Sequence, residues 1–185
     1  MPETVAIIGA GPLGRWLALA AARAGFRVLL EDVMPANLHH AEEWLQVELG
    51  AETLPEITLV STIEDAVREA DLAIDCVPDE LESKLEILWL LDRMAPPRTV
   101  LATPTTRLSI TDLANCTYRS EKCIAIATEA SALTGNARAG GDGREILLLS
   151  TTSTSRESVE LVERFWRELG FKPVFEGEGA RQSLS

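Results

Sequence analysis

Three glycines lie close together near the start of the chain, in the pattern Gly9-x-Gly11-x-x-Gly14. A short apolar run over residues 4–8 precedes them, and an alanine-rich helical segment over residues 15–24 follows. In such a pattern the first glycine permits a tight turn and the second lets the backbone approach a pyrophosphate, while the third lets helix and strand pack closely. The helix N-terminus adds free N–H groups and a positive dipole end. The pattern therefore predicts a dinucleotide-binding turn.

Two acidic residues, Glu31 and Asp32, end the next apolar run, and Glu31 lies 22 positions after Gly9. A carboxylate near this spacing accepts hydrogen bonds from the hydroxyls of the adenosine ribose, and we assign this role to Glu31. The 2′-phosphate of NADP would meet two carboxylates, so NAD is the expected cofactor. Pro12 and Leu13, inside the turn, are expected to contact it too. Two alternatives stay open: the glycines form only a tight turn, or the chain binds FAD, whose proteins use a similar pattern.

The chain offers few groups for acid–base or metal chemistry. Its two histidines, His39 and His40, are adjacent in a predicted helix and cannot share one helical face, so we interpret them as surface residues. The cysteines Cys76, Cys116 and Cys123 lack metal-ligand spacing, and no metal site is expected. Reduced thiols in the cytoplasm are the plainest interpretation of three unpaired cysteines.

Short apolar runs alternate with helical segments along the whole chain. Strands are expected at 4–8, 26–31, 57–60, 72–77, 99–102, 123–127, 146–149 and 172–175, and helices at 15–24, 35–49, 61–70, 79–95, 109–115 and 154–169. Capping motifs beginning at Ser61, Asp79 and Thr154 are expected to start three of these helices. The alternation predicts a single-domain α/β fold of the Rossmann type, a doubly wound and mostly parallel sheet, over residues 1–175. Residues 137–144 are expected to form a flexible loop and residues 176–185 a flexible tail.

The composition is that of an ordinary globular chain, with 185 residues of which 46% are hydrophobic and 25% charged. Seventeen basic and 29 acidic residues give a formal net charge of −12, which argues against a nucleic-acid surface or an anionic membrane surface. No apolar run reaches the roughly 18 residues that a membrane span needs, and the acidic N-terminus has no signal-peptide pattern. A small-molecule dinucleotide is therefore the expected partner.

Four blocks of sequence carry a more specific signal. They are VAIIGAGPLG at 5–14 with VLLE at 28–31, ADLAIDCVPDELESK at 70–84, TVLATPTTRLSITDLA at 99–114, and the ending from residue 154 to LGFKPV at 169–174. Together they resemble the NAD-binding domain of the 3-hydroxyacyl-CoA dehydrogenases. The resemblance implies hydride transfer between NAD and a 3-hydroxyacyl substrate in fatty-acid metabolism. It also implies a substrate-oxygen contact at Thr106 and cofactor contacts at Cys76, Val77, Pro78, Asp79, Lys84 and Thr103.

Structural roles remain open for three of these residues. Asp79 is also a good N-cap for the helix that follows it. Lys84 has Glu80 four residues before it, where the two could form an ion pair on a helix surface. Cys76 could be a small buried apolar residue, and no histidine is predicted near it to activate a thiolate.

The departures from the family pattern fall on its catalytic residues. The family's histidine aligns with Ala127 and its glutamate with Leu147, although a slip of one or two residues would bring Glu145 into play. Pro104 stands where the family has an asparagine on the cofactor side. Glu129 could act as a substitute base, with a place on the cleft rim as the alternative. The family's C-terminal helical domain, which closes the cleft and forms most of the dimer, has no counterpart in these residues.

Two hypotheses follow. The chain is a 3-hydroxyacyl-CoA dehydrogenase-like oxidoreductase for an acyl-CoA substrate, catalytically incomplete by itself, or it is a non-catalytic NAD-binding regulatory or accessory module. Around Trp89 and Leu90 the predicted helix is apolar over more of its circumference than one sheet face covers. We therefore expect a homodimer through this helix, or a separate helical domain as partner, with burial under a neighbouring helix as the alternative.

Overall fold

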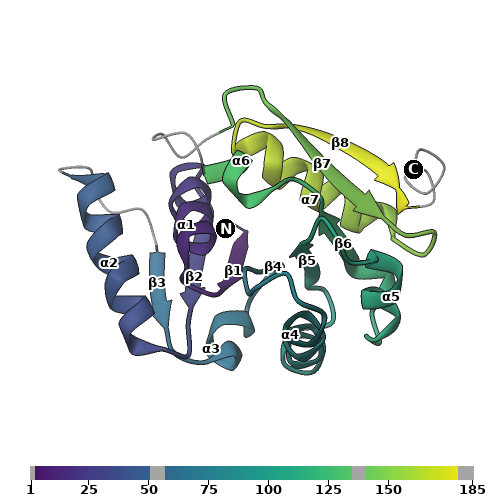
Figure 1. The fold of residues 1–185 in the computed structure, drawn as a ribbon, viewed down its shortest axis with the longest axis horizontal. Helices are drawn as coiled ribbons and strands as arrows, with labels where there is room; N and C mark the ends of the chain where they lie inside the picture. The colour runs from purple at the N-terminus through teal and green to yellow at the C-terminus, as the bar shows by residue number, and fades with distance from the viewer. Residues whose placement is uncertain (1–2, 51–56, 135–140, 179–185) are drawn as a thin grey trace.

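The structure is a computed structural model that describes residues 3–50, 57–134 and 141–178, and its helices and strands alternate along the chain (Figure 1). The strands are β1 (Thr4–Ile8), β2 (Arg27–Glu31), β3 (Ile57–Val60), β4 (Leu72–Asp75), β5 (Val100–Pro104), β6 (Cys123–Ile126), β7 (Glu145–Ser150) and β8 (Lys172–Gly177). The helices are α1 (Pro12–Arg23), α2 (Pro35–Leu49), α3 (Ile63–Val67), α4 (Leu81–Met94), α5 (Ile110–Asn115), the 3-10 helix η1 (Ser120–Lys122), α6 (Ala130–Thr134) and α7 (Arg156–Glu168). The one-turn elements α6 and η1 were not predicted.

These strands form one sheet in the order β3-β2-β1-β4-β5-β6-β7-β8. The first six strands run parallel to their neighbours, whereas β7 is antiparallel to β6 and β8 is parallel to β7. The prediction of a doubly wound, mostly parallel sheet in one domain is confirmed. The strand order reverses between β1 and β4, and in such sheets the ligand crevice opens at the carboxyl ends beside this point.

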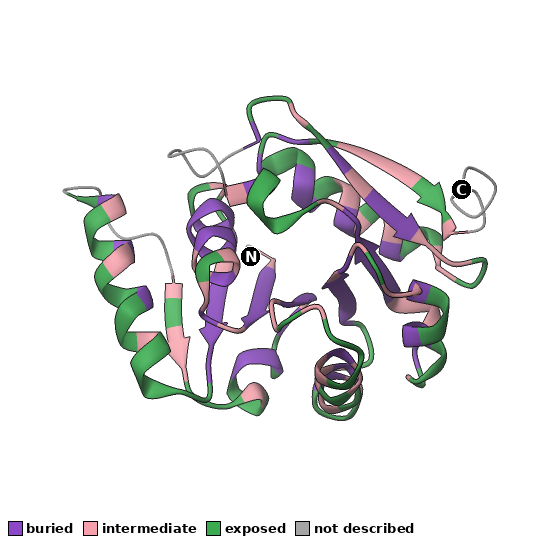
Figure 2. Cartoon of the chain, viewed as in Figure 1, coloured by how far each residue is buried: buried purple, intermediate pink, exposed green. Residues whose placement is uncertain are grey.

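Helices cover both faces of the sheet, which gives three layers (Figures 1 and 2). One apolar cluster joins α1, α2, α6 and α7 to residues such as Ile7 and Leu30, and a second joins α3, α4 and α5 to residues such as Ile8 and Leu29. Neighbouring residues on one strand thus enter different clusters, because successive side chains point to opposite faces. Burial on both faces explains why the strands are continuous apolar runs in the sequence.

Several helices begin at residues other than those predicted. α1 begins at Pro12 rather than Arg15, since proline has no N–H to leave unpaired in the first turn. The Thr62 hydroxyl, not that of Ser61, caps α3 by accepting a hydrogen bond from the N–H of Asp65 at 3.2 Å. At α7 the cap is Ser155 instead of Thr154. In both corrected cases the cap is the residue directly before the first helical one, where the backbone is still extended.

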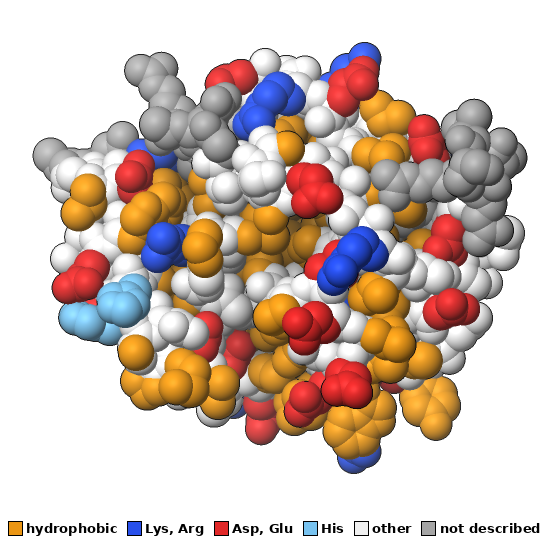
Figure 3. Space-filling view, viewed as in Figure 1, with side chains coloured by type: hydrophobic (Ala, Val, Ile, Leu, Met, Phe, Trp, Pro, Cys, Tyr) orange, Lys and Arg blue, Asp and Glu red, His pale blue; other side chains and the backbone are white. Residues whose placement is uncertain are grey.

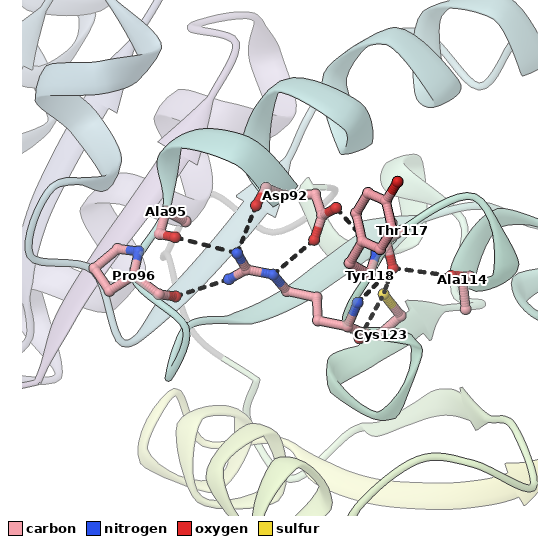
Figure 4. A network of polar contacts seen from close by, with 8 residues as sticks. Asp92, Ala95, Pro96, Ala114, Thr117, Tyr118 and Cys123 are labelled. Atoms are coloured by element: carbon pink, nitrogen blue, oxygen red, sulfur yellow. Dashed lines mark hydrogen bonds and ion pairs between the residues drawn. The ribbon is translucent and has the colours of Figure 1, made fainter.

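The buried Arg119 closes the C-terminal end of α4, where it contacts Asp92, Ala95 and Pro96, which are labelled in Figure 4. The guanidinium of Arg119 donates to the backbone oxygens of Asp92, Ala95 and Pro96 at 2.6, 3.1 and 2.7 Å. It also pairs with the Asp92 carboxylate at 2.9 Å. The last carbonyls of a helix lack partners within the helix, so this side chain from beyond α5 satisfies groups that would otherwise be buried unpaired.

The C-terminal end of the fold lies later than predicted. β8 continues through Glu176 to Gly177, and the carboxylate of Glu178 accepts a hydrogen bond from the N–H of Thr111 at 2.9 Å. The start of the predicted tail is therefore ordered, while residues 179–185 lie outside the described residues. Of the predicted flexible loop, only residues 141–144 are described, and the N–H groups of Gly141 and Gly143 are hydrogen-bonded to backbone oxygens at 2.8 Å.

No helix in the described ranges is long and apolar enough to cross a membrane.

Candidate functional site

The glycine turn between β1 and α1 has the geometry that each glycine was predicted to provide. Gly9 has a φ of +104°, and its N–H donates to the carbonyl of Glu31 at 2.8 Å. A Cβ on Gly14 would lie 1.8 Å from the backbone oxygen of Gly9, so only glycine fits there. A Cβ on Gly11 would meet nothing within 4 Å, which leaves open space in front of the N-terminus of α1. The turn thus presents free N–H groups to a ligand phosphate.

The two acids at the end of β2, Glu31 and Asp32, have different surroundings. The carboxylate of Asp32 lies against the glycine turn, where it accepts hydrogen bonds from the N–H groups of Ala10 at 2.9 Å and Met34 at 2.8 Å. The side-chain amide of Asn37 bridges both its oxygens at 3.1 Å. Glu31 is only 4% exposed, and none of these contacts involves it. Sequence spacing assigned the ribose hydroxyls to Glu31, whereas the carboxylate that lies against the glycine turn is that of Asp32.

A pocket of about 230 Å³ opens at the carboxyl ends of β4, β5 and β6. Figure 3 shows a hollow near the middle of this face, with apolar side chains deep inside and charged ones around the rim. Seven residues predicted for the site line the pocket: Leu13, Cys76, Val77, Pro78, Asp79, Thr106 and Glu129. The pocket also includes Pro104, Thr105, Thr128 and Ala130, of which only Pro104 had been singled out, as a departure from the family pattern.

Thr105 is a pocket residue that the sequence analysis did not single out. It is 3% exposed, and its hydroxyl accepts hydrogen bonds from the N–H groups of Leu108 at 3.0 Å and Arg107 at 3.4 Å. These bonds fold the segment after β5 into a turn that presents Thr106 to the pocket. The run of threonines before a serine and a helix was the available signal, because hydroxyl side chains form such turns.

Asp79 holds the turn after β5 and is not a helix cap. One carboxylate oxygen accepts a hydrogen bond from the N–H of Thr106 at 3.2 Å, and the guanidinium of Arg107 lies 3.8 Å from the same oxygen. The N-cap of α4 is Glu80, whose side chain makes no capping bond. The other oxygen of Asp79 is buried and has no hydrogen-bond partner among the described residues, so it can accept one from a ligand.

Lys84 lies behind the pocket rather than on its wall. Its ammonium is fully buried and lies 2.5 Å from the equally buried carboxylate of Asp75. The alternative pair with Glu80 does not occur, because Asp75 engages the Lys84 ammonium. Burial raises the pKa of Asp75, although the charge of Lys84 acts in the opposite direction. Thr103, another predicted cofactor residue, is also buried, with 1% exposure.

The thiol of Cys76 is unsuited to nucleophilic chemistry. It follows β4, and its N–H donates to the carbonyl of Ile8 at 2.7 Å. Burial, reinforced by the Asp75 carboxylate, raises the pKa of the Cys76 thiol far above its ordinary value. The thiolate is the reactive form, so Cys76 serves as a wall of the pocket.

The two positions that align with the family's catalytic histidine and glutamate, Ala127 and Leu147, hold apolar residues. The N–H of Ala127 donates to the carbonyl of Leu147 at 2.9 Å across β6 and β7, and both side chains belong to the core cluster of α3, α4 and α5. Glu145, the alternative after a slip in alignment, is exposed and pairs with Lys172 at 2.8 Å. His39 and His40 are exposed on α2, as predicted, and neither lines the pocket. Within the described ranges, no His, Cys, Asp and Glu cluster could hold a metal ion.

Comparison with known proteins decides the family. Residues 4–127 match the 3-hydroxyacyl-CoA dehydrogenase, NAD binding domain. This chain belongs to the 3-hydroxyacyl-CoA dehydrogenase family. A probable 3-hydroxybutyryl-CoA dehydrogenase of Bacillus subtilis is 34% identical over 135 residues, which are 66% of this chain and 47% of that protein. The 3-hydroxyadipyl-CoA dehydrogenase of Escherichia coli is 33% identical over 60% of this chain and 26% of that protein.

Solved structures of this family share the fold. A 3-hydroxyacyl-CoA dehydrogenase from Archaeoglobus fulgidus superposes with a TM-score of 0.78 at 26% identity, over 98% of this chain and 60% of that one. A diketoreductase superposes with a TM-score of 0.79 at 26% identity, over 95% of this chain and 64% of that one. The chain spans less than half the length of the two curated relatives named above.

The residues at the glycine turn fit the cofactor of this family. The open space at Gly11, the free end of α1 and the Asp32 carboxylate match the pyrophosphate and ribose of a dinucleotide. The domain is therefore an NAD-binding domain, as predicted, and the family match sets the FAD alternative aside.

Proposed function

We propose that NAD lies across the carboxyl ends of β2, β1 and β4, with its adenosine at β2 and its nicotinamide over the pocket. Asp32 is assigned to the ribose hydroxyls, because its carboxylate already lies against Ala10 in the turn that receives the pyrophosphate. Asp79, which lines the pocket and has an unpaired buried oxygen, is assigned to the nicotinamide half. The buried pair of Lys84 and Asp75 positions the segment between them without touching the cofactor.

Calorimetric titration with NAD and NADP tests this arrangement. NAD should bind more tightly, since a 2′-phosphate would approach the Asp32 carboxylate. Asp32→Asn should weaken the binding of NAD by about 1–3 kcal/mol, the usual cost of losing a charged hydrogen-bond partner. Tighter binding of NADP, or an Asp32→Asn variant that folds and binds NAD normally, would contradict the assignment.

The reaction class that the family supports is oxidation or reduction of a 3-hydroxyacyl-CoA, with NAD accepting or supplying the hydride when bound. Thr106 would hold the substrate oxygen from the turn after β5. Glu129 is exposed on the rim of the pocket. Of the two carboxylates that line the pocket, Asp79 accepts a hydrogen bond from the N–H of Thr106 and Glu129 does not. We expect the isolated chain to lack the acid–base step of this reaction. The observation that carries this expectation is the apolar pair of Ala127 and Leu147, because neither side chain can accept a proton. The isolated chain should therefore bind NAD with little turnover.

The assay is NADH formation from 3-hydroxybutyryl-CoA at high protein concentration. General acid–base assistance is typically worth about 10²–10⁴ in rate, so its absence should leave no appreciable turnover. Turnover near about one per second, lost in Thr106→Ala or Glu129→Gln, would show instead that the chain is a complete enzyme. NAD binding without turnover, even when the helical domain of a relative is added, would favour the second hypothesis of a non-catalytic accessory module.

Self-association through α4 is a further part of the proposal. Trp89 is 51% exposed, and the guanidinium of Arg93 lies 4.6 Å from its ring centroid. Glu86, Trp89 and Arg93 share one outward face of the helix by their spacing. If two copies of α4 pack antiparallel with the two-fold axis beside Trp89, Arg93 of one copy faces Glu86 of the other. The neighbouring Leu90 would then pack against the partner's tryptophan.

Light scattering at micromolar protein tests this dimer. Trp89→Ala should give a monomer, and Arg93→Glu should weaken the dimer, whereas adding Glu86→Arg to that variant should restore it. A wild-type monomer, or a double variant no better than the single one, would contradict the arrangement. In that case the exposed face of α4 is left for a separate helical domain.

A reducing cytoplasm is the proposed location. The three cysteines, Cys76, Cys116 and Cys123, are all free in the structure, and burial raises the pKa of the Cys123 thiol to about 11. Thiol titration of freshly purified protein under denaturing conditions should find three reduced groups. Cell fractionation that recovers the protein outside the cytoplasm would overturn the assignment.

A further inference from the structure

Two buried acids lie at the carboxyl ends of β2 and β4, the two parallel strands that flank β1, on one face of the sheet. Glu31 on β2 and Asp75 on β4 both pair in register with Ile8, the last residue of β1. Side chains in register point to the same face, and Ile8 belongs to the cluster under α3 and α4. Glu31, Ile8 and Asp75 thus form one row at the edge where the dinucleotide binds.

The two acids differ in whether a cationic side chain lies beside the carboxyl group. Asp75 is completely buried, and the ammonium of Lys84 pairs with it at 2.5 Å. Glu31 is 4% exposed and its carboxyl group makes no hydrogen bond to the described residues, but its oxygens are not among the fully buried atoms that lack a partner, so they reach the surface at this edge of the sheet. Burial and the nearby Asp32 carboxylate raise the pKa of Glu31 to about 7. A carboxyl group that reaches the crevice and has no donor from the protein can accept a hydrogen bond from a ligand group there.

The position of Glu31 limits which ligand group that is. Its carbonyl accepts a hydrogen bond from Gly9 in the glycine turn, so it lies at the adenosine half of the crevice. Asp32, the next residue, carries its side chain to the glycine turn, where the ribose is expected. Successive side chains of a strand point to opposite faces, which directs Glu31 away from the ribose. On the adenosine half, the 6-amino group of adenine is the donor that remains.

We propose that Glu31 recognises the adenine of NAD by accepting a hydrogen bond from its 6-amino group. The inference rests on the proposed position of NAD in this crevice. A carboxyl group keeps an accepting oxygen whether or not it is protonated, so the contact forms on both sides of neutral pH. Exposed Val33, just past Asp32, and exposed Leu81, at the start of α4, provide apolar surface at the same edge for the purine ring.

Nicotinamide purine dinucleotide is the probe, since it replaces the 6-amino group with a hydrogen and leaves the rest of NAD, including the ring nitrogens, unchanged. The wild-type chain should bind NAD about tenfold more tightly than the probe by calorimetry, because the probe has no donor at this position for the carboxyl oxygen. In Glu31→Val this preference should fall to about one, while Glu31→Gln, which keeps an accepting oxygen, should retain most of it. Removing a buried carboxyl group should not impair folding, and thermal denaturation checks this.

Asp32→Asn is the matched control. Both dinucleotides contain the same ribose, so this variant should weaken the binding of both by a similar factor. The ratio of the two affinities should therefore stay as in the wild type. Equal binding of NAD and the probe by the wild type, or an unchanged ratio in Glu31→Val, would overturn the inference and leave the proposed function standing. A loss of NAD affinity in Glu31→Val with an unchanged ratio would return Glu31 to the ribose. Failure of the wild type to bind either dinucleotide would overturn the proposed function and the inference together.

Discussion

Removing the ammonium of Lys84 should destabilise the domain strongly. Lys84 and Asp75 are both completely buried and lie 2.5 Å apart, so each neutralises a charge that water cannot reach. Lys84→Met leaves the Asp75 carboxyl group without its cation, and breaking a buried pair on one side costs about 3–5 kcal/mol. That is a large part of the about 5–15 kcal/mol by which a domain of this size is stable.

Urea unfolding followed by circular dichroism measures the effect in Lys84→Met, Asp75→Leu and the double variant. The double variant should recover most of the loss, because replacing a buried ion pair with apolar side chains is often neutral. The exposed pair of Arg68 and Asp65, at 2.9 Å, is the control, and Arg68→Ala should cost no more than about 1 kcal/mol. A cost below about 1 kcal/mol for Lys84→Met would refute the reasoning.

The NAD affinity of the same variants separates positioning from contact. If Lys84 only positions the segment between β4 and α4, the double variant of Lys84 and Asp75 should recover NAD affinity along with stability. A double variant that is stable but binds NAD poorly would show that Lys84 touches the cofactor, as the sequence predicted.

Three further predictions concern Glu31, Arg119 and Gly14. The pKa of Glu31 is raised from 4.5 to about 7, so its burial favours the protonated form, and stability should fall as pH rises from 4.5 to 7. Relative to Glu31→Gln, the free energy of unfolding of the wild type in urea should fall by about 1–3 kcal/mol between pH 5 and pH 8. The same dependence of stability on pH in both proteins would contradict this. Arg119→Lys should lower stability by about 1–3 kcal/mol in the same assay, because an ammonium cannot reach all the carbonyls that the guanidinium binds. An unchanged urea midpoint would show that these hydrogen bonds contribute little. Gly14→Ala places a Cβ 1.8 Å from the backbone oxygen of Gly9, so NAD binding by calorimetry should be lost, and normal affinity would mean that the turn moves freely.

Local signals in the sequence determined most of the helices and strands. α2 spans Pro35–Leu49 as predicted, since proline favours the first turn and Gly50, with a φ of +54°, ends the helix. The glycine turn after β1 was also predictable, because a positive φ at Gly9 and the lack of space at Gly14 are properties of a few adjacent residues. The cofactor class followed from that turn and the acids 22 and 23 residues after Gly9.

The partners of the charged side chains were decided only by the tertiary structure. Lys84 pairs with Asp75 instead of Glu80, because α4 packs its inner face on the end of β4. Asp32 rather than Glu31 lies at the glycine turn, because adjacent residues at the end of a strand point in different directions. Sequence spacing determines periodicity and the location of turns, whereas a hydrogen bond or ion pair also needs the register of the strands and the rotation of each helix, which depend on contacts far along the chain.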